Sequence, residues 1–334
     1  MPVRLSLQQV EDLTQRALLA SGVREDNARS VTRSVVASEA DGIHSHGLAR
    51  LPTYCEHARC GKIDGHADPT ASRVAAAGVK VDAHDGFAHP AIDLGLADFL
   101  PLARESGIAA LAVTNSYNCG VVGYHVERIA DVGLVALGFV NAPASIAPWG
   151  GSRPVFGTNP LACAVPRDGS APLVIDQSSS VVAKSEIVVH KQKGEPIPEG
   201  WALDADGNPT TDPDAALAGS MVPMGGYKGA GIALVVEILA AAVTGSNFAI
   251  DASSFANNEG GSPRTGQFFI GIDPRAFGGD DFGQRLEHLF AAIEGQEGAR
   301  LPGQGRLKTR ERTASDGVEI TDILHDKLEG YAGG

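Results

Sequence analysis

The densest polar cluster in the N-terminal third of the chain is the run His44, Ser45 and His46, followed one helical turn later by Arg50. The planar fork of an arginine binds a carboxylate through two hydrogen bonds, and a histidine beside it can donate a proton. Such a pair suits a small substrate that carries a carboxylate. A single His-x-His run is weak evidence for a metal, so we predict no metal site. The simpler alternative is a pair of ordinary surface histidines.

A glycine-rich segment from Gly225 to Gly229, which includes Tyr227 and Lys228, precedes a long apolar stretch. At a helix N-terminus it would offer an anion free backbone N–H groups, a favourable dipole and one lysine. The sequence contains neither the G-x-G-x-x-G fingerprint nor a P-loop, so a conventional Rossmann fold is not supported. The alternative is a plain glycine-rich helix start with a solvated lysine.

The composition excludes several classes of protein. The 334 residues carry 40 acidic and 27 basic side chains, for a net charge of −13, and this charge makes nucleic acids and anionic membranes poor partners. The N-terminus lacks the apolar core of a signal peptide, and the cysteines fit no disulfide or zinc pattern. We therefore predict a soluble, cytoplasmic protein whose thiols are reduced. The cysteines are Cys55, Cys60, Cys119 and Cys163.

Hydrophobic patterns place the polar cluster between two helices. A helix over 28–40 ends at Gly42, and another covers 48–59, so His44 to Arg50 form a junction. Continuous apolar runs predict buried strands, and their alternation with helices indicates an α/β fold. The expected strands are 79–83, 108–113, 134–140, 161–165, 173–176 and 267–272, and the further helices are 91–104, 124–131, 230–243 and 284–293, with a capped helix starting at Ser6.

Three other features bear on the site. Pro101 is predicted to end or kink the helix over 91–104. The polar stretch 191–214 is typical of a surface excursion, and the chain from Gly303 onward is a charged tail. Glu186 follows the strand that ends at Asp176. A carboxylate there is usually solvated, although one hydrogen-bonded to a histidine would fix the tautomer of that ring.

Taken in order, the motifs resemble the malate/L-lactate dehydrogenase family of NAD(P)-dependent oxidoreductases, which does not use the Rossmann fold. The resemblance extends from Ser6 to Arg306, and its order makes it specific. Within the family, the chain is most similar to the Δ1-piperideine-2-carboxylate/Δ1-pyrroline-2-carboxylate reductase branch. The landmarks are Ser45-His46-Gly47 with Arg50, Thr114-Asn115-Ser116, Pro148 to Gly151, Gly157 to Pro160, the strand end at Asp176, Pro223 to Gly229, Gly266 to Asp273, and Pro302-Gly303.

The resemblance implies an α/β fold with a mixed sheet wrapped by helices and a homodimer as the minimal unit. It implies that residues 1–114 together with 275–334 form a helical part for substrate binding and dimerisation, and that 115–274 form the cofactor-binding part. It assigns catalysis to Ser45, His46 and Glu186 as a relay, and substrate binding to Arg50 and Thr158. The implied contacts to NADPH, or alternatively NADH, are Asn118, Cys119, Gly120, Asp176, Gln177, Ser178, Tyr227, Lys228, Pro302, Gly303, Gln304, Gly305 and Arg306.

One position departs from the family pattern. Hydroxyacid members usually have a histidine in the motif N-S-x-H-x-G, where this chain has Asn118. Asparagine is neither an acid nor a base, so His46 is left as the only obvious proton donor. We therefore predict reduction of a cyclic α-imino acid, because a protonated C=N bond readily accepts hydride. The expected substrate is Δ1-pyrroline-2-carboxylate, which gives L-proline, with Δ1-piperideine-2-carboxylate, which gives L-pipecolate, as a second one. The alternatives are a 2-hydroxyacid dehydrogenase of the malate or lactate type and a non-catalytic binding protein with the same fold.

Overall fold

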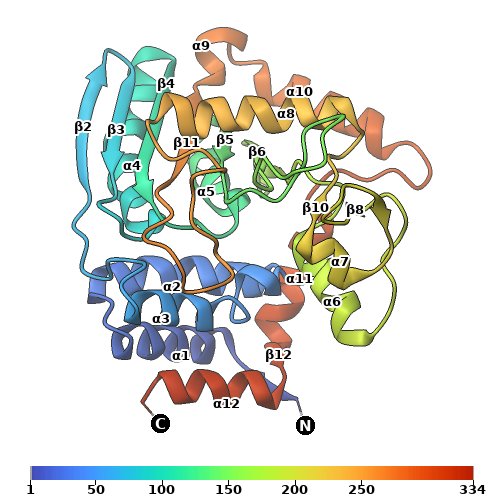
Figure 1. Ribbon diagram of the computed structural model, residues 1–334. Coiled ribbons are helices and arrows are strands. Elements are labelled where there is room, and N and C mark those ends of the chain that lie inside the picture. The colour runs from blue at the N-terminus through green and yellow to red at the C-terminus, as the bar shows by residue number, and fades with distance from the viewer. Residues whose placement is uncertain (1, 334) are drawn as a thin grey trace.

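The computed structural model describes residues 2–333, and its centre is a seven-stranded sheet (Figure 1). The strand order is β2-β3-β4-β11-β5-β6-β7. Strands β3 and β4 are parallel and the other neighbouring pairs are antiparallel, so the sheet is mixed, as predicted. The strands are β2 (Thr70–Ala75), β3 (Gly78–Asp82), β4 (Ile108–Ser116), β11 (Thr265–Ile272), β5 (Val135–Val140), β6 (Leu161–Val165) and β7 (Leu173–Gln177).

The central strand, β11, comes from the last quarter of the chain and lies between β4 and β5. It is antiparallel to both, so β4 and β5 run parallel to each other. Its Phe269 is fully buried, in the same core cluster as Val113 of β4 and Ala136 of β5. These apolar runs form strands because helices cover both faces of the sheet.

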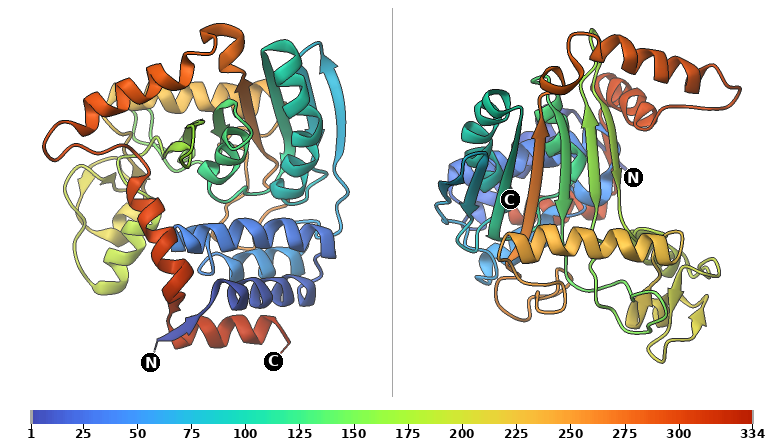
Figure 2. Two further views of the ribbon diagram at one scale, coloured as in Figure 1. Left: turned by 180° about the vertical axis from the view of Figure 1, so that it is seen from behind. Right: turned by 90° about the horizontal axis from the view of Figure 1, so that it is seen from above.

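One face of the sheet is covered by α4 (Ala88–Ser106) and α5 (Val122–Ala130), and the other by α8 (Tyr227–Glu237) with the π-helical turn η2 (Ile238–Val243) (Figure 2). Pro101 lies inside α4, and the helix continues to Ser106. The expectation that this proline ends the helix is therefore wrong, and the alternative of a kink stays a prediction. Proline removes one helical hydrogen bond, and the packing of α4 against β3 and β4 maintains the helix despite that loss.

A layer of helices lies beside one end of the sheet (Figure 1). Its first helix begins with the predicted cap, in which Ser6 Oγ accepts from the N–H of Gln9 and the Gln9 side chain accepts from the N–H of Ser6. Strand β1, near the N-terminus, pairs with β12, which precedes the last helix, and the short helix η1 joins α2 to α3. The elements are α1 (Leu7–Ala20), α2 (Glu25–Ala40), η1 (His44–His46), α3 (Leu51–Arg59), α12 (Asp322–Tyr331), β1 (Val3–Leu5) and β12 (Val318–Ile320).

Two polar regions contain more regular structure than their sequences indicate. The stretch 191–214 belongs to a small unit with its own core, which includes Ile187, Ile197 and Met221. The charged tail is largely helical, because two arginines of α11 form ion pairs with buried carboxylates. The elements are α6 (Lys184–Lys193), β8 (Ala202–Leu203), β9 (Pro209–Thr210), α7 (Pro213–Ala218), β10 (Ser220–Met221), α9 (Pro274–Gly278), α10 (Phe282–Glu294) and α11 (Gln304–Asp316).

Among residues 2–333, none of the helices has both the length and the apolar character that a membrane-spanning segment requires. The division into 1–114 with 275–334 and 115–274 stays a prediction.

Candidate active site

The junction between α2 and α3 is organised by Glu39, whose side chain is 1% exposed. Its Oε1 accepts a hydrogen bond from the N–H of Leu48 at 2.6 Å, and its Oε2 lies 2.6 Å from Nδ1 of His44. A Cβ atom on Gly47 would lie 2.1 Å from Glu39 Oε1, so only glycine fits there. The hydrogen bond to Glu39 raises the pKa of His44. His44 therefore helps to hold the turn that carries Ser45 and His46.

His46 is the candidate for proton transfer at this junction. Its ring is half-buried, and Nδ1 lies 3.1 Å from Ser45 Oγ. Within residues 2–333, its Nε2 makes no hydrogen bond. Burial, together with the nearby charge of Arg50, lowers the pKa of His46 to about 4. The ring is therefore neutral at physiological pH, and an anion bound to Arg50 would offset the repulsion and raise this pKa.

Arg50 lies close to two aromatic rings. Its guanidinium carbon is 5.8 Å from the ring centroid of Tyr54 and 5.6 Å from that of Phe255. In the described part of the chain, Arg50 forms no ion pair. Stacking on rings orients a guanidinium group without using its hydrogen-bond donors. Arg50 is therefore available to bind a carboxylate.

Asn118, on the loop after β4, is hydrogen-bonded to the same tyrosine. The Tyr54 hydroxyl donates to Asn118 Oδ1 at 2.9 Å, and the N–H of Gly120 donates to the same oxygen at 2.8 Å. Because two donors occupy the amide oxygen, the NH2 group is the part of Asn118 left to meet a ligand, and it can only donate. Tyr54 thus contacts Arg50 through its ring and Asn118 through its hydroxyl.

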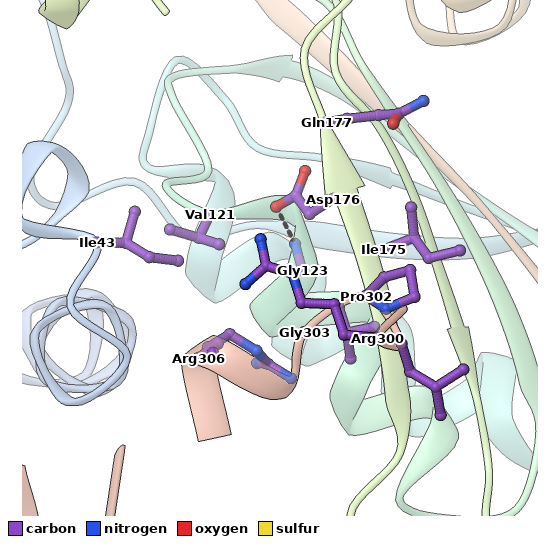
Figure 3. Close-up of a pocket in the computed structure, with 13 residues that line it drawn as sticks. Ile43, Val121, Gly123, Ile175, Asp176, Gln177, Arg300, Pro302, Gly303 and Arg306 are labelled. Carbon is purple, nitrogen blue, oxygen red and sulfur yellow. Dashed lines mark hydrogen bonds between the residues drawn. The ribbon is translucent and has the colours of Figure 1, made fainter. Parts of the chain in front are cut away.

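A cavity of about 560 Å³ lies between β7, the start of α5 and the segment that leads into α11 (Figure 3). Asp176, at the end of β7, accepts a hydrogen bond from the N–H of Gly123 at 2.7 Å, and burial raises the pKa of this carboxyl. The volume is in the range of ordinary small-molecule sites. The lining includes six of the predicted cofactor contacts, which are Asp176, Gln177, Pro302, Gly303, Gly305 and Arg306.

The cavity has the groups that a phosphate-bearing ligand requires. Gly123 in the first turn of α5 lines the cavity, and because its N–H already donates to Asp176, this turn offers an anion the positive end of the helix dipole. Arg306 lines the cavity, and its buried Nε has no hydrogen-bond partner within residues 2–333. Arg300, which also lines it, forms no ion pair in the same described part of the chain. These residues fit the anionic portion of a dinucleotide.

The model of the malate/L-lactate dehydrogenase family matches residues 5–329. The chain belongs to this family. It is 49% identical over 330 residues to the (2R)-3-sulfolactate dehydrogenase (NADP(+)) of Chromohalobacter salexigens, with 98% of each chain covered. It is 39% identical over 331 residues to the Δ1-pyrroline-2-carboxylate reductase of Ancylobacter novellus, covering 98% of this chain and 97% of that one. The crystal structure of Δ1-piperideine-2-carboxylate reductase from Pseudomonas syringae pvar. tomato matches with a TM-score of 0.93 and 36% identity, over 98% of this chain and 99% of that one.

Membership of the malate/L-lactate dehydrogenase family confirms the resemblance found in the sequence, including the similarity to the reductase branch. It also confirms the predicted α/β class, with a mixed sheet wrapped by helices. At the level of the family, the chain is an oxidoreductase with a nicotinamide cofactor. The relatives include both imine reductases and a dehydrogenase of a 2-hydroxy acid, so they leave open which kind of bond this chain acts on.

Several residues that the family resemblance assigns to the site lie apart from these contacts. Glu186 is exposed in the first turn of α6 and, within residues 2–333, makes no hydrogen bond to His46. Tyr227 is 63% exposed, and Lys228 Nζ lies 6.0 Å from its ring, so both are at the surface start of α8 and outside the cavity lining. Thr158 is half-buried, and its carbonyl accepts from the N–H of Ser179 at 2.7 Å.

Three other predicted cofactor contacts have partners within the protein. The carbonyl oxygen of the buried Cys119 lies 2.8 Å from Nε2 of His125, and burial raises the pKa of the Cys119 thiol to about 12. The hydroxyl of Ser178 is hydrogen-bonded to Ser180, and the side-chain amide of Gln304 donates to Glu294. The roles assigned to all these residues stay predictions.

Four residues of the site were not predicted from the sequence: Glu39, Tyr54, Phe255 and Arg300. Tyr54 carried a usable signal, because it lies one helical turn after Arg50 and residues with that spacing share a helix face. Glu39 carried a weaker one, as an acidic residue beside the predicted helix end. Phe255 is distant in sequence from everything it contacts, and no local pattern indicates its position.

Proposed function

We propose that this protein reduces a cyclic α-imino acid with NADPH, converting Δ1-pyrroline-2-carboxylate to L-proline and acting also on Δ1-piperideine-2-carboxylate to give L-pipecolate. The observation that carries this proposal is one unpaired arginine fork beside one histidine, with Asn118 where a second acid or base would stand. A protonated C=N bond requires orientation and one proton-transfer group, so this set suffices. The reductase relatives and the similar reductase structure support the proposal.

In the proposed mechanism, Arg50 binds the substrate carboxylate through its fork and so fixes the position of the α-carbon. His46 exchanges a proton with the substrate nitrogen, and Ser45 holds its Nδ1 and thereby the ring orientation. Thr158 is proposed as a second substrate contact. Glu186 is proposed as the carboxylate of the relay, which requires it to reach His46 when the substrate is bound. The bound nicotinamide supplies the hydride.

NADPH is proposed as the cofactor in preference to NADH. The cavity beside β7 would hold its phosphates against the start of α5, Arg300 and Arg306. The relative from Chromohalobacter salexigens is named for NADP(+), which supports the phosphorylated form. Tyr227 and Lys228 would contact another portion of the same cofactor.

A 2-hydroxy acid is the second candidate substrate, and two observations favour it. The sulfolactate dehydrogenase is 49% identical to this chain, whereas the pyrroline-2-carboxylate reductase is 39% identical. The NH2 group of Asn118 would also donate to the carbonyl oxygen of a 2-oxo acid, whereas it cannot accept from a protonated imine nitrogen. Here the neutral imidazole of His46 would take the proton of the substrate hydroxyl during oxidation.

Measurement of kcat/KM distinguishes the two candidates. It is made both for reduction with NADPH and for oxidation with NADP(+). The panel consists of the two cyclic imines, oxaloacetate, pyruvate and 3-sulfopyruvate, with NADH in parallel. A preference of about tenfold or more for a cyclic imine is expected. A preference for 3-sulfopyruvate or oxaloacetate would replace the proposal with the second candidate. If the protein binds the cofactor but turns over no compound of the panel, the conclusion is a non-catalytic binding protein.

We also propose a homodimer, which would bury the outer face of α8. Leu234, Val235 and Ile238 on this helix are 47%, 50% and 46% exposed. Contiguous exposed apolar residues often mark a protein interface. Analytical ultracentrifugation should give a dimer for the wild type, and Val235→Glu should weaken it. A wild-type monomer at micromolar concentration would contradict this proposal.

A cytoplasmic location is proposed as well, because the four cysteines are free and a reducing compartment keeps thiols in that state. Fractionation of the host cells would test it.

A further inference from the structure

Lys62, three residues after α3, has an unusual environment for a lysine. Its side chain is 2% exposed. Its Nζ donates three hydrogen bonds to backbone carbonyl oxygens, at 2.6 Å to Ser254, 3.0 Å to Asn257 and 2.6 Å to Glu259. All three ammonium protons are therefore used on one segment of the chain, residues 254–259, which we call the clamp loop. This loop precedes β11 and descends from the sheet to the helices α2 and α3 (Figure 1).

The clamp loop carries Phe255, which is one of the two rings around Arg50. Its ring centroid is 5.6 Å from the guanidinium carbon of Arg50 and 5.0 Å from the ring centroid of Tyr117. Tyr117 is held in turn by His57, whose Nδ1 lies 2.7 Å from the tyrosine hydroxyl. One of the two aromatic rings next to Arg50 is thus supplied by the clamp loop.

We propose that Lys62 is a positioning residue for the substrate site, which acts by fixing the clamp loop so that Phe255 holds Arg50 in the orientation that binds the substrate carboxylate. This inference rests on the proposed role of Arg50. Lys62 lies just beyond the C-terminal end of α3, and Arg50 at its N-terminal end. The short helix α3 therefore connects Lys62, which anchors the clamp loop, to Arg50, which contacts Phe255 of that loop.

The bonding pattern explains why a lysine is needed. Three carbonyl oxygens that point at one buried spot repel one another, and a single ammonium group satisfies all of them. Ser254, Asn257 and Glu259 are exposed residues, so without the ammonium group their carbonyls can turn to water if the loop lifts. Removal of Lys62 should therefore release the loop and leave the rest of the fold intact.

The first test compares Lys62→Met, Lys62→Arg and Phe255→Ala in the full-length protein. Lys62→Met should raise KM for the carboxylate substrate about tenfold, with a smaller change in kcat and no change in the dissociation constant of NADPH. Lys62→Arg keeps the charge and several donors, so it should restore part of the loss. Phe255→Ala should raise KM to a similar extent, and the double variant Lys62→Met/Phe255→Ala should be no worse than either single variant, because both changes remove the same contact.

Asn27→Ala is the matched control. Asn27 is also buried, and its Nδ2 holds a different segment through the carbonyl oxygens of Gly65 at 3.1 Å and Ala67 at 2.9 Å. This variant should lose stability and keep the wild-type KM. If it raises KM as much as Lys62→Met does, or if the double variant shows additive losses, Lys62 has only a general structural role and the proposal is overturned.

Two measurements do not depend on the identity of the substrate. Hydrogen exchange should become faster at residues 254–260 in Lys62→Met and remain unchanged there in Asn27→Ala. Labelling of Arg50 by phenylglyoxal, followed by peptide mass spectrometry, should also become faster in Lys62→Met alone. Unchanged exchange and labelling would overturn the proposal even if the substrate is as proposed. Faster exchange and labelling in a protein that turns over no 2-carboxylate would support the role of Lys62 and contradict the proposed function.

Discussion

The hydroxyl group of Tyr54 and the amide oxygen of Asn118 are 2.9 Å apart, and the hydroxyl is the donor. Because this contact occupies the amide oxygen, the side chain of Asn118 can act toward a ligand only as a hydrogen-bond donor. A ligand that meets Asn118 encounters an N–H group and no acceptor. The distinction matters because a carbonyl oxygen accepts hydrogen bonds throughout its reduction, whereas a protonated imine nitrogen only donates them.

Asn118→Asp should separate the two substrate classes. A carboxylate oxygen can still accept from Tyr54 and Gly120, so the loop should keep its shape, and the second oxygen replaces a donor with a negatively charged acceptor. Reduction of 2-oxo acids should fall about tenfold or more relative to reduction of cyclic imines, when kcat/KM is measured on the same preparation. Equal losses on both classes would show that Asn118 does not face the reacting atom.

His46→Asn should lower kcat by about 10² to 10⁴, the range for loss of a positioned acid or base, while the dissociation constant of NADPH stays within error. Ser45→Ala is the control, because it removes the partner of Nδ1 and keeps the ring, and its loss should be smaller. Stopped-flow turnover and fluorescence titration measure the two quantities. Wild-type kcat in His46→Asn would exclude this residue from proton transfer.

Arg50→Lys and Arg300→Ala should each weaken the binding of a different ligand. A lysine cannot reproduce the planar fork, so Arg50→Lys should raise KM for the carboxylate substrate about tenfold and leave NADPH binding unchanged. Arg300→Ala removes a cation from the cavity lining, and it should weaken NADPH more than NADH, with KM for the substrate unchanged. The reverse pattern in the two titrations would mean that substrate and cofactor occupy each other's proposed sites.

Stability should fall on acidification, because burial lowers the pKa of four histidines, one of which is His57. The pKa is lowered to about 4 in His46 and His125 and to about 3 in His89. In the unfolded chain a histidine titrates near about 6.5, so below that pH the unfolded state binds more protons than the folded state, and each buried histidine lowers the free energy of unfolding by about 1.4 kcal/mol per pH unit. His44, whose pKa is raised, opposes this trend.

Urea unfolding at about pH 7.5, pH 6 and pH 5 measures this slope. Nε2 of His125 lies 2.8 Å from the carbonyl oxygen of Cys119. In His125→Gln, the side-chain amide can donate the same hydrogen bond, and it does not titrate. That variant should reduce the slope by about 1.4 kcal/mol per pH unit. A free energy of unfolding that stays constant over this range would show that the buried rings take up protons in the folded state.

Local patterns predicted the elements whose signals are contained in a few neighbouring residues. The capping box at Ser6 and Gln9 is one example, and the buried strand β5 is another. The junction that carries Ser45 and His46 was also predicted, because a helix stop at Gly42 and a helix restart are both local events. The contact between Ser45 and His46 follows directly from their adjacency.

The parts that were missed depend on partners distant in sequence. The helix α11 has a polar sequence, and its attachment to the rest of the fold depends on ion pairs of Arg306 and Arg310 with Asp41 and Glu127. The role of Asn118 as a hydrogen-bond donor depends on Tyr54, and the orientation of Arg50 depends on Phe255. A side chain whose role is set by such a partner carries no signature in its own neighbourhood, so sequence alone could name Arg50 and Asn118 without showing what holds them.

The position of β11 also has a consequence for how the chain is made. During synthesis, β4 and β5 leave the ribosome long before residues 265–272, which must lie between them. Until then each of these two apolar strands has an open edge, where the N–H and C=O groups that later bind β11 are unpaired. Closure of the sheet therefore has to wait for nearly the whole chain, which predicts slow folding and a nascent state that depends on chaperones to avoid aggregation.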